Sequence, residues 1–526
     1  MKLHNKKSLI FVILLLAMYV IGYASFLDKS PLVWGDEVAL TDMAWSFANE
    51  GVPKSHIYGN VHHVEEKIVS EPLLYLALLA LYLKLVGLTV MKVRLFSVFF
   101  GLVTLLLTFY LAKKFYGEKI AYISSLALFL NPLFFTSARI VREEIVETAF
   151  LTAGIYMLLM YGSNKKKRYL IFSGMLLGLT FLSHFIGLVM TTAILLSILL
   201  EKATLKNKMK DLLYFIISFG IIILPYIVYI MTNYSLFYEQ FFISNNEYAR
   251  LPSSINHIIQ NILNEPYRWT QNGLGTIVSL YPGVIILAYL LLFKKEKENK
   301  LVQISILFIL LSIFLESTKW GGYFTLLLPC LSIFLGSIII ETYNQFIIQY
   351  RSSTLLKYGA LLLIFGAILS IDGFAIIYKV HKTSDSNYSA FCDKLTEQIP
   401  SKKMILGPPT FWFCFKQNYT GTINLRLVLI LDKSFEQVIK TLKIDYFILD
   451  PPLKELLERV YSNNFTYLNP PLKEIFKETK DRGSMQNLTT IITSVCSEIA
   501  FIEDKYYTTS FSKKDNKTVI FKCTHD

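Results

Sequence analysis

Clusters of ionisable residues stand beside long apolar stretches at three places in the sequence. Asp36 and Glu37 follow the first apolar stretch, Arg139 and Arg142 lie between two later ones, and Lys319 precedes another. A carboxylate pair can supply a general base, orient a hydroxyl group or bind a metal ion. Two arginines three residues apart would share one face of a helix and can bind a phosphate group bidentately. The three clusters therefore offer acid–base chemistry and phosphate binding.

Each cluster also has an ordinary structural explanation. An aspartate such as Asp36, placed before an apolar periodic run, is typical of a helix N-cap. Arg139 and Arg142 can reach a membrane surface and pair with neighbouring glutamates. Lys319 stands among aromatic residues of the kind that anchor a helix at that surface. The residues by themselves leave both interpretations open.

A divalent metal site has weaker support. The candidate ligands are Asp36, Glu144, His62 and His63, and the two histidines are adjacent in a stretch with many acidic residues. No strong spacing of metal ligands is present, and solvated loop histidines are the alternative. The sequence contains no P-loop, no G-x-S-x-G elbow and no H-E-x-x-H motif. It therefore indicates no nucleotide site and no certain cofactor, and it leaves a divalent metal open.

The composition places these clusters in a membrane protein. Hydrophobic residues make up 53% of the 526 residues and charged residues 17%, against about 25% charged residues in soluble proteins. The apolar residues fall in blocks of about twenty, which is enough for a helix to cross a bilayer. The net charge of +13 comes from short basic clusters between these blocks, as in cytoplasmic loops. It does not come from one basic stripe, so nucleic-acid binding is excluded.

The basic clusters predict how the chain crosses the membrane. Placing them all inside gives a polytopic α-helical protein with about eleven spans, the N-terminus inside and the C-terminus outside. The predicted spans are residues 8–27, 93–112, 120–137, 144–161, 169–183, 185–200, 212–230, 276–293, 301–316, 322–341 and 357–377. A further apolar block at residues 72–90 would invert the later clusters if it crossed. We therefore expect it to lie on the outer membrane surface, within a first outer loop of residues 28–92.

After residue 379 the composition becomes that of a soluble domain. Residues 404–407 and 446–450 are short apolar runs that predict strands, and residues 435–443 and 453–461 predict helices. We therefore expect a transmembrane domain at residues 1–379 and an α/β domain outside the membrane at residues 380–526. An even number of cysteines in an oxidising compartment allows two disulfides with three pairings. The four candidates are Cys392, Cys414, Cys496 and Cys523.

The order of these clusters and of several short motifs resembles the GT-C superfamily of glycosyltransferases. The similar branch contains the protein O-mannosyltransferases and the aminoarabinose transferase of lipid A, and the resemblance extends over residues 8–341. The motifs are Asp36-Glu37, S-E-P-L-L-Y at 70–75, V-R-L-F-S at 93–97, N-P-L-F-F-T-S-A-R-I-V-R-E-E at 131–144 and K-W-G-G-Y-F-T-L-L-L-P at 319–329. The W-W-D-Y-G motif is absent, which argues against an oligosaccharyltransferase catalytic subunit.

The resemblance implies a membrane enzyme that moves a sugar from a polyprenyl-phosphate donor to a protein, lipid or glycan acceptor. Transfer would take place at the outer face of the cell membrane, with inversion at the anomeric carbon. The alternatives are a transporter or flippase for lipid-linked glycans and a non-catalytic protein that binds them. Charges that gather at outer helix ends rather than at mid-membrane favour the enzyme over the transporter.

The resemblance also implies a role for each charged cluster. Arg139, Arg142 and Lys319 would bind the donor phosphate and offset the charge that grows on it during transfer. Asp36 and Glu37 would be catalytic, with Asp36 as general base on the acceptor hydroxyl. The residues expected to position the substrates are Glu144 and Tyr323.

Overall fold

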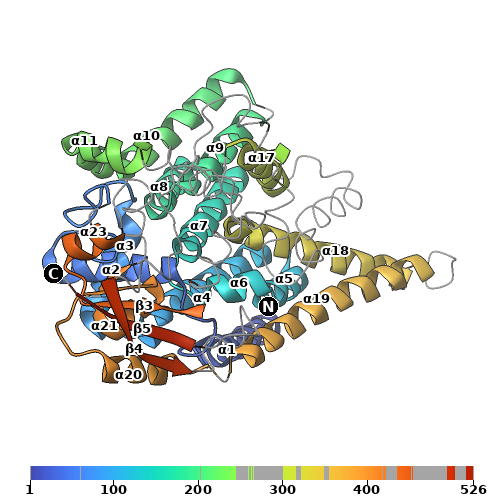
Figure 1. Ribbon diagram of the computed structural model, residues 1–526. Helices are drawn as coiled ribbons and strands as arrows, with labels where there is room; N and C mark the ends of the chain where they lie inside the picture. The colour runs from blue at the N-terminus through green and yellow to red at the C-terminus, as the bar shows by residue number, and fades with distance from the viewer. Residues whose placement is uncertain are drawn as a thin grey trace.

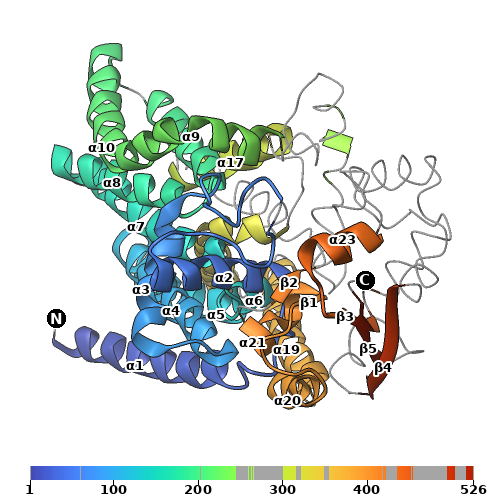
Figure 2. The same cartoon turned by 60° about the vertical axis from the view of Figure 1, so that its left-hand side comes forward.

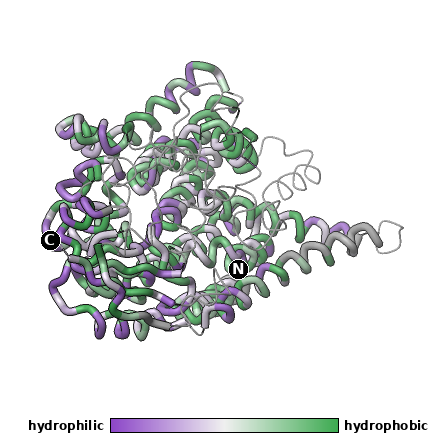
Figure 3. Tube along the Cα trace, in the orientation of Figure 1, coloured by the Kyte–Doolittle hydropathy of each residue, from purple (hydrophilic) through white to green (hydrophobic). Residues whose placement is uncertain are grey.

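The computed structural model shows a helical body joined to a small β-sheet (Figure 1). It describes residues 2–59, 61–201, 203–243, 259, 262–263, 265, 300–315, 321–348, 355–384, 386–416, 419–421, 435–451, 453, 495–503 and 517–524. Hydrophobic residues dominate the helical body, and hydrophilic segments gather on the side of the sheet (Figure 3). The chain is therefore organised as an apolar helical part with a more polar part at one side.

Most of the predicted spans coincide with helices. The helices before residue 243 are α1 (Lys2–Ala24), α2 (Gly35–Glu50), α3 (Leu73–Val86), α4 (Val90–Phe115), α5 (Glu118–Phe129), α6 (Pro132–Ser137), α7 (Glu143–Asn164), α8 (Lys167–Ser183), α9 (Ile186–Leu199), α10 (Leu205–Thr232), α11 (Tyr234–Phe237) and the π-helix η1 (Tyr238–Ile243). Between residues 300 and 383 the described helices are α17 (Lys300–Leu315), the 3₁₀-helix η3 (Gly321–Leu327), α18 (Leu328–Ile348) and α19 (Leu355–Thr383). The predicted span at 276–293 lies outside the described residues.

Four of the described helical segments are long and apolar enough to cross a membrane. They are Val90–Phe115, Glu143–Asn164, Leu205–Thr232 and Gly321–Gln345. Shorter apolar helices include Ser8–Ala24, Ile186–Leu199 and Lys300–Leu315, together with Leu73–Val86 in the block expected on the membrane surface. The total of about eleven spans stays a prediction.

The predicted span at 120–137 is interrupted. Its first part is α5 and its second part is α6, and the break falls at Asn131-Pro132. The Asn131 side chain accepts hydrogen bonds from the backbone amides of Leu133 and Phe134 at 3.0 Å, and Pro132 occupies the first position of α6. Both features start a new helix, because Asn caps free amides and Pro fits the first turn. The chain therefore reaches residues 138–142 from a short, separately capped helix.

Glycines allow α8 and α10 to approach closely. A Cβ atom at Gly174 would lie 2.6 Å from the carbonyl oxygen of Phe215, and one at Gly178 would lie 2.8 Å from the Cβ of Ile222. Small residues four apart are the usual way for two membrane helices to bring their backbones together. The spacing of the two glycines thus determines how these helices pack.

Basic residues at several helix ends pair with acidic residues of neighbouring helices. Lys113 of α4 lies 3.7 Å from Glu118 of α5, and Lys167 of α8 forms an ion pair with Asp211 of α10. Lys300 of α17 likewise pairs with Glu201, just after α9. These lysines belong to the clusters expected inside, so helix ends expected on one membrane surface contact one another.

The sheet near the C-terminus has five strands in the order β2-β1-β3-β5-β4. They are β1 (Ile405–Gly407), β2 (Tyr419–Gly421), β3 (Tyr446–Leu449), β4 (Cys496–Glu503) and β5 (Lys517–Cys523). β1 pairs in parallel with β2 and β3, whereas β5 pairs antiparallel with β3 and β4. The runs predicted as strands form β1 and β3, and the helix predicted at 435–443 is α23 (Phe435–Leu442). Only Leu453 of the helix predicted at 453–461 is among the described residues.

The two faces of the sheet belong to different apolar clusters. Ile405, Ile448 and Ile520 pack on the side of α20 (Tyr388–Gln398), whereas Phe447 and Phe521 pack with Ile439 of α23. This division follows the two-residue alternation of side chains along a strand. The first face is the one that meets the N-terminal part of the chain, as described below.

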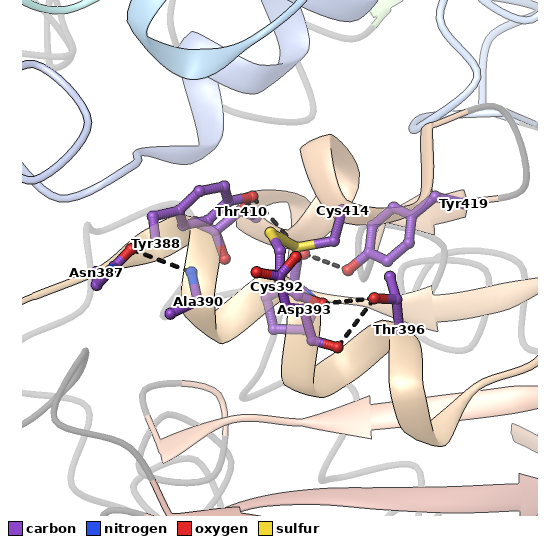
Figure 4. Close-up of a disulfide and its surroundings, with 10 residues drawn as sticks. Asn387, Tyr388, Ala390, Cys392, Asp393, Thr396, Thr410, Cys414 and Tyr419 are labelled. Atoms are coloured by element: carbon purple, nitrogen blue, oxygen red, sulfur yellow. Dashed lines mark hydrogen bonds between the residues drawn. A yellow bond between two sulfur atoms is a disulfide. The ribbon is translucent and has the colours of Figure 1, made fainter.

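The four cysteines of this region form two disulfides. Cys392 of α20 is bonded to Cys414 of α21 (Trp412–Phe415), and Cys496 of β4 is bonded to Cys523 of β5. This is one of the three pairings that the sequence allowed. One bond ties two helices together beside the sheet (Figure 4), and the other joins two strands.

Candidate active site

The predicted carboxylate pair forms the first turn of α2. This helix begins at Gly35 after Trp34, whose backbone is extended, and no side chain caps it. The side chain of Asp36 is 53% exposed, whereas that of Glu37 is fully buried. A helix N-terminus stabilises negative charge, because its free amide groups point outward. The exposed fractions show that the two adjacent carboxylates have different surroundings, and that of the two only Asp36 faces the surface.

Glu37 forms a buried ion pair with Arg94 of α4. The Glu37 Oε1 and Oε2 atoms accept hydrogen bonds from Arg94 Nε at 2.8 Å and Nη2 at 2.7 Å, and neither side chain is exposed. Arg94 Nη1 also donates to the carbonyl oxygens of Leu27 and Pro31, and the amide of Val141 donates to Glu37. This geometry favours a structural role for Glu37, in place of the catalytic role expected from the sequence.

Arg139 is also fully buried, and its guanidinium group binds backbone rather than open surface. Nη1 donates to the carbonyl oxygens of Gly22 and Tyr23, and Nη2 donates to those of Ser25, Phe26 and Ser30. The guanidinium also lies 4.7 Å from the centre of an aromatic ring on α6. Arg139 therefore holds the chain between α1 and α2, and this arrangement does not favour the expected contact with a donor phosphate.

Arg142 is the cation that lies beside the exposed carboxylate. Its Nη1 atom donates to Asp36, and its Nε atom donates to both oxygens of Glu144 at 3.0 Å. The guanidinium also lies 5.1 Å from the centre of the Trp34 ring. Burial lowers the pKa of Arg142, but the carboxylates of Glu144 and Asp36 outweigh it and raise that pKa well above its usual value. Asp36, Arg142 and Glu144 thus form a charged triad, here called the surface triad, at the N-terminal ends of α2 and α7.

Further acidic residues of α7 lie behind the surface triad. Glu143 and Glu147 are one turn apart and buried. The carboxylate oxygens of Glu147 and the hydroxyl of Tyr75 have no hydrogen-bond partner within the described part of the chain. α7 is one of the helices long and apolar enough to cross a membrane. Ionisable side chains inside such a helix are costly and therefore mark functional positions more often than structural ones. Glu147 and Tyr75 were not identified from the sequence, although Tyr75 belongs to the S-E-P-L-L-Y motif.

Tyr323 and Lys319 were expected at the same outer surface. Tyr323 lies in η3, and its ring centre is 5.4 Å from that of His184, the residue between α8 and α9. Lys319 lies outside the described residues. Arg94 was missed as a site residue, although the V-R-L-F-S motif contains it and could have identified it.

The four candidate metal ligands have two different sets of partners. Asp36 and Glu144 are both bound to Arg142. His62 lies 3.6 Å from Glu239 of η1, and the exposed His63 lies 3.3 Å from Glu66. The structure does not bring the four together around one point. In the described residues, the group close enough to share an ion is instead His63, Glu65 and Glu66, all near the surface of the first outer loop.

Asp42 organises the loop that follows α2. Its buried carboxylate accepts hydrogen bonds from the Ser55 hydroxyl at 2.9 Å and from the amides of His56 and Ile57 at 2.7 and 3.1 Å. The His56 ring lies between two carboxylates, with Nδ1 3.0 Å from Asp42 and Nε2 3.1 Å from Glu50. These contacts fix the first outer loop against the helix that carries Asp36.

We expect the stability of this loop to fall as the pH rises. The hydrogen bond to Asp42 raises the pKa of His56 above its usual value near 6.5, although burial opposes the rise. A raised pKa in the folded state means that protonated His56 stabilises the fold below about pH 6.5 and that this contribution is lost as the pH passes the folded pKa. Thermal unfolding of wild type and His56→Gln between pH 5.5 and 8.5 measures it. The wild-type advantage should shrink with rising pH, and parallel curves would contradict the assignment.

Comparisons with known proteins bear on this arrangement. A family model described as dolichyl-phosphate-mannose-protein mannosyltransferase matches residues 70–229. No curated protein sequence shows a significant match. ArnT from Cupriavidus metallidurans bound to undecaprenyl phosphate is similar in structure, with a TM-score of 0.60 and 12% identity over 98% of this chain and 97% of that chain.

The archaeal oligosaccharyltransferase AglB from Archaeoglobus fulgidus, in complex with an inhibitory peptide and a dolichol-phosphate, is also similar. Its TM-score is 0.55, with 10% identity over 97% of this chain and 74% of that chain. Identities this low make both structures evidence for a shared fold. Together with the family match, they support the resemblance seen in the sequence motifs: residues 70–229 match the mannosyltransferase family model, and the chain shares the fold of ArnT and AglB.

Proposed function

We propose that this membrane protein transfers a sugar from a polyprenyl-phosphate carrier to a hydroxyl group of a protein, lipid or glycan acceptor. The observation that supports it most is the surface triad. An exposed carboxylate at a helix N-terminus lies against an arginine at the edge of an apolar helical body. A lipid-linked donor would keep its tail in the bilayer and bring its phosphate to that edge.

The reaction needs a base for the acceptor and a cation for the leaving group. The acceptor oxygen attacks the anomeric carbon opposite the phosphate, so a new carbon–oxygen bond forms as the bond to the phosphate oxygen breaks. Asp36 takes the acceptor proton, and the bonding electron pair leaves with the lipid phosphate. Attack from the opposite side inverts the anomeric centre. Arg142 offsets the negative charge that grows on the phosphate, which is where a fixed cation lowers the barrier most.

The remaining site residues support this pair. Glu144 holds Arg142 through its Nε atom, whereas Asp36 accepts from Nη1. Glu37 fixes the first turn of α2 through Arg94. We further propose that Lys319 adds a second cation for the phosphate and that Tyr323 helps position the substrates. Whether a divalent metal takes part is tested by adding a chelator to the transfer assay, because a reaction that needs the metal would then slow down.

We further propose that the chain has two domains with a fixed orientation in the membrane. Residues 1–379 form the transmembrane part with about eleven spans, and residues 380–526 form an α/β domain outside the cell membrane. The N-terminus lies inside, so that residues 28–92 face outward with the surface triad. Support comes from the lysines expected inside, whose ion pairs join neighbouring helix ends.

Replacing Arg142 with glutamine tests the proposed function. We expect wild-type protein in detergent to release sugar from polyprenyl-phosphate donors. The variant should lose about 10²- to 10³-fold in kcat/KM, as is usual when one group that stabilises a developing oxyanion is removed. Arg168→Gln is a matched control, because Arg168 is an exposed arginine in a cluster expected on the inner side.

The outcomes separate the function classes. Full activity of Arg142→Gln would overturn the role of Arg142 but keep the enzyme. Tight binding of every donor without release of sugar, together with movement of labelled lipid between leaflets of proteoliposomes, would replace the transferase with a flippase. Tight binding with neither event would indicate a protein that only binds lipid-linked glycans.

A further inference from the structure

The first outer loop and the C-terminal sheet share one apolar core. This shared core contains Val33, Val38, Ile57 and Val90 from the N-terminal part and Tyr388, Phe391, Leu395, Ile399, Ile405, Phe411, Trp412, Tyr419, Tyr446, Ile448 and Ile520 from the C-terminal part. Trp412 and Phe411 are fully buried in it. Side chains far apart in the sequence therefore exclude water together, and neither part forms this core alone.

The contact reaches the turn of α2 that carries Asp36. The 3₁₀-helix η4 (Pro409–Phe411) lies against α2, and a Cβ atom at Gly35 would be 3.9 Å from the Cβ of Pro409. The next strand is joined to the outer loop by backbone, because the Gly421 amide donates to the Ile57 carbonyl at 2.8 Å. A Cβ atom at Gly421 would be 2.4 Å from Ile57 Cγ2, so this approach requires glycine. Figure 2 shows the elements of the two parts, with β1 and β2 near the end of α2 and α21 below them.

Residues 408–416, which we call the clamp segment, contain only η4 and the single turn α21. So short a helix has little stability of its own. α20 holds the segment in place through the Cys392–Cys414 disulfide and through the Tyr388 hydroxyl, which donates to the Thr410 carbonyl at 2.6 Å (Figure 4). From the other side, the Tyr419 hydroxyl donates to the Pro408 carbonyl. The disulfide therefore fixes a segment that would otherwise have few internal constraints.

We propose that the clamp segment is a positioning element of the active site and that the Cys392–Cys414 disulfide is required for efficient transfer. One side of the first turn of α2 rests on this segment, and Asp36 projects from the same turn to the surface. A shift of about 1 Å in a reacting group can cost about 100-fold in rate. Releasing the clamp would let this turn move relative to Arg142, which is fixed from α7. The part of the test that measures activity rests on the proposed transferase function.

The second disulfide provides a matched control. Cys496 and Cys523 join β4 to β5 and pack in the cluster on the opposite face of the sheet. Their loss removes one covalent bond from the same region without touching the shared core. If the disulfides only stabilised the fold, loss of either one would lower activity. If the clamp disulfide positions the active site, only the loss of Cys392–Cys414 would do so.

The test compares Cys392→Ser/Cys414→Ser with Cys496→Ser/Cys523→Ser in the full-length protein. We expect kcat to fall at least about tenfold in the first variant, with the KM for the donor within about twofold of wild type. The control should keep kcat within about twofold. Hydrogen exchange of the amides at residues 36–41 should become faster in the first variant alone. Equal kcat and equal exchange in the two variants would overturn the proposal.

A milder variant covers the case in which the double serine variant fails to fold. Tyr388→Phe keeps the disulfide and the aromatic ring but removes the hydrogen bond to Thr410, and it should change kcat and α2 exchange in the same direction. Hydrogen exchange does not depend on turnover. If wild type shows no transfer, the proposed function fails, and faster α2 exchange in the clamp variants would still establish that the clamp segment fixes this turn.

Discussion

Replacing Asp36 with asparagine should reduce the rate of sugar transfer by about 10²- to 10⁴-fold, the usual contribution of a general base. Asparagine keeps the shape of the side chain but cannot accept the acceptor proton. Donor binding should change little, because Arg142 keeps its hydrogen bonds to Glu144. The measurement is the initial rate of transfer at saturating donor, together with the KM for the donor.

The same variant should unfold at nearly the wild-type temperature. The Asp36 side chain is half exposed, and ion pairs of that kind contribute about 0–1 kcal/mol. Asp28→Asn is the control, because it makes the same chemical change at another exposed aspartate of the first outer loop. Unchanged turnover in Asp36→Asn would remove Asp36 as base. An equal loss in Asp28→Asn would indicate a general effect of loop charge.

The sequence pattern identified the carboxylate pair but not the difference between its members. Asp36 and Glu37 are adjacent, and nothing in their types says which one faces the surface. The answer depends on Arg94, which lies in another helix and pairs with the carboxylate of Glu37. A buried charge needs a partner, so the position of that partner decides the burial. Tertiary contacts of this kind are not encoded in local spacing.

The two arginines show how a sound local rule gives the wrong geometry. Spacing by three residues places Arg139 and Arg142 on one face only if the segment is helical. In the structure α6 ends at Ser137 and α7 begins at Glu143, so both arginines lie in the connection. Arg139 consequently points to the end of α1, and Arg142 points to α2. The predicted spans 120–137 and 144–161 already placed both arginines between helices, and outside a helix a spacing of three residues does not give a shared face.

The sequence predicted helices and some strands better than it predicted which strands or cysteines pair with each other. Long hydrophobic runs predicted most of the described helices, because a membrane helix must be apolar throughout. The runs that form β1 and β3 were also recognised, but β2, β4 and β5 were not. β2 has the sequence Y-T-G, which is not an apolar run, and β5 pairs with a strand about seventy residues earlier. Pairing over such distances depends on the whole sheet, as does the selection of one disulfide pairing from three.

Breaking the ion pair between Glu37 and Arg94 should have the largest effect on stability. Arg94→Met leaves the Glu37 carboxylate buried without its cation and removes the donors to the Leu27 and Pro31 carbonyls. Loss of one partner from a buried pair costs about 3–5 kcal/mol. We therefore expect a marked fall in the unfolding temperature and in the yield of monodisperse protein. Glu201→Gln is the control, because the Glu201–Lys300 pair is only partly buried and should matter much less.

Substitutions of Glu37 distinguish a structural role of its carboxylate from a catalytic one. Glu37→Gln keeps one oxygen that can accept from Arg94, so its stability should lie between those of wild type and Arg94→Met. The double variant Glu37→Leu/Arg94→Met removes both charges and should be more stable than Arg94→Met alone, because no buried charge is left unpaired. A structural role predicts that activity falls in parallel with the folded fraction. If Glu37→Gln kept its unfolding temperature and lost turnover, the carboxylate would take part in the chemistry, and the buried pair would have to open when substrate binds.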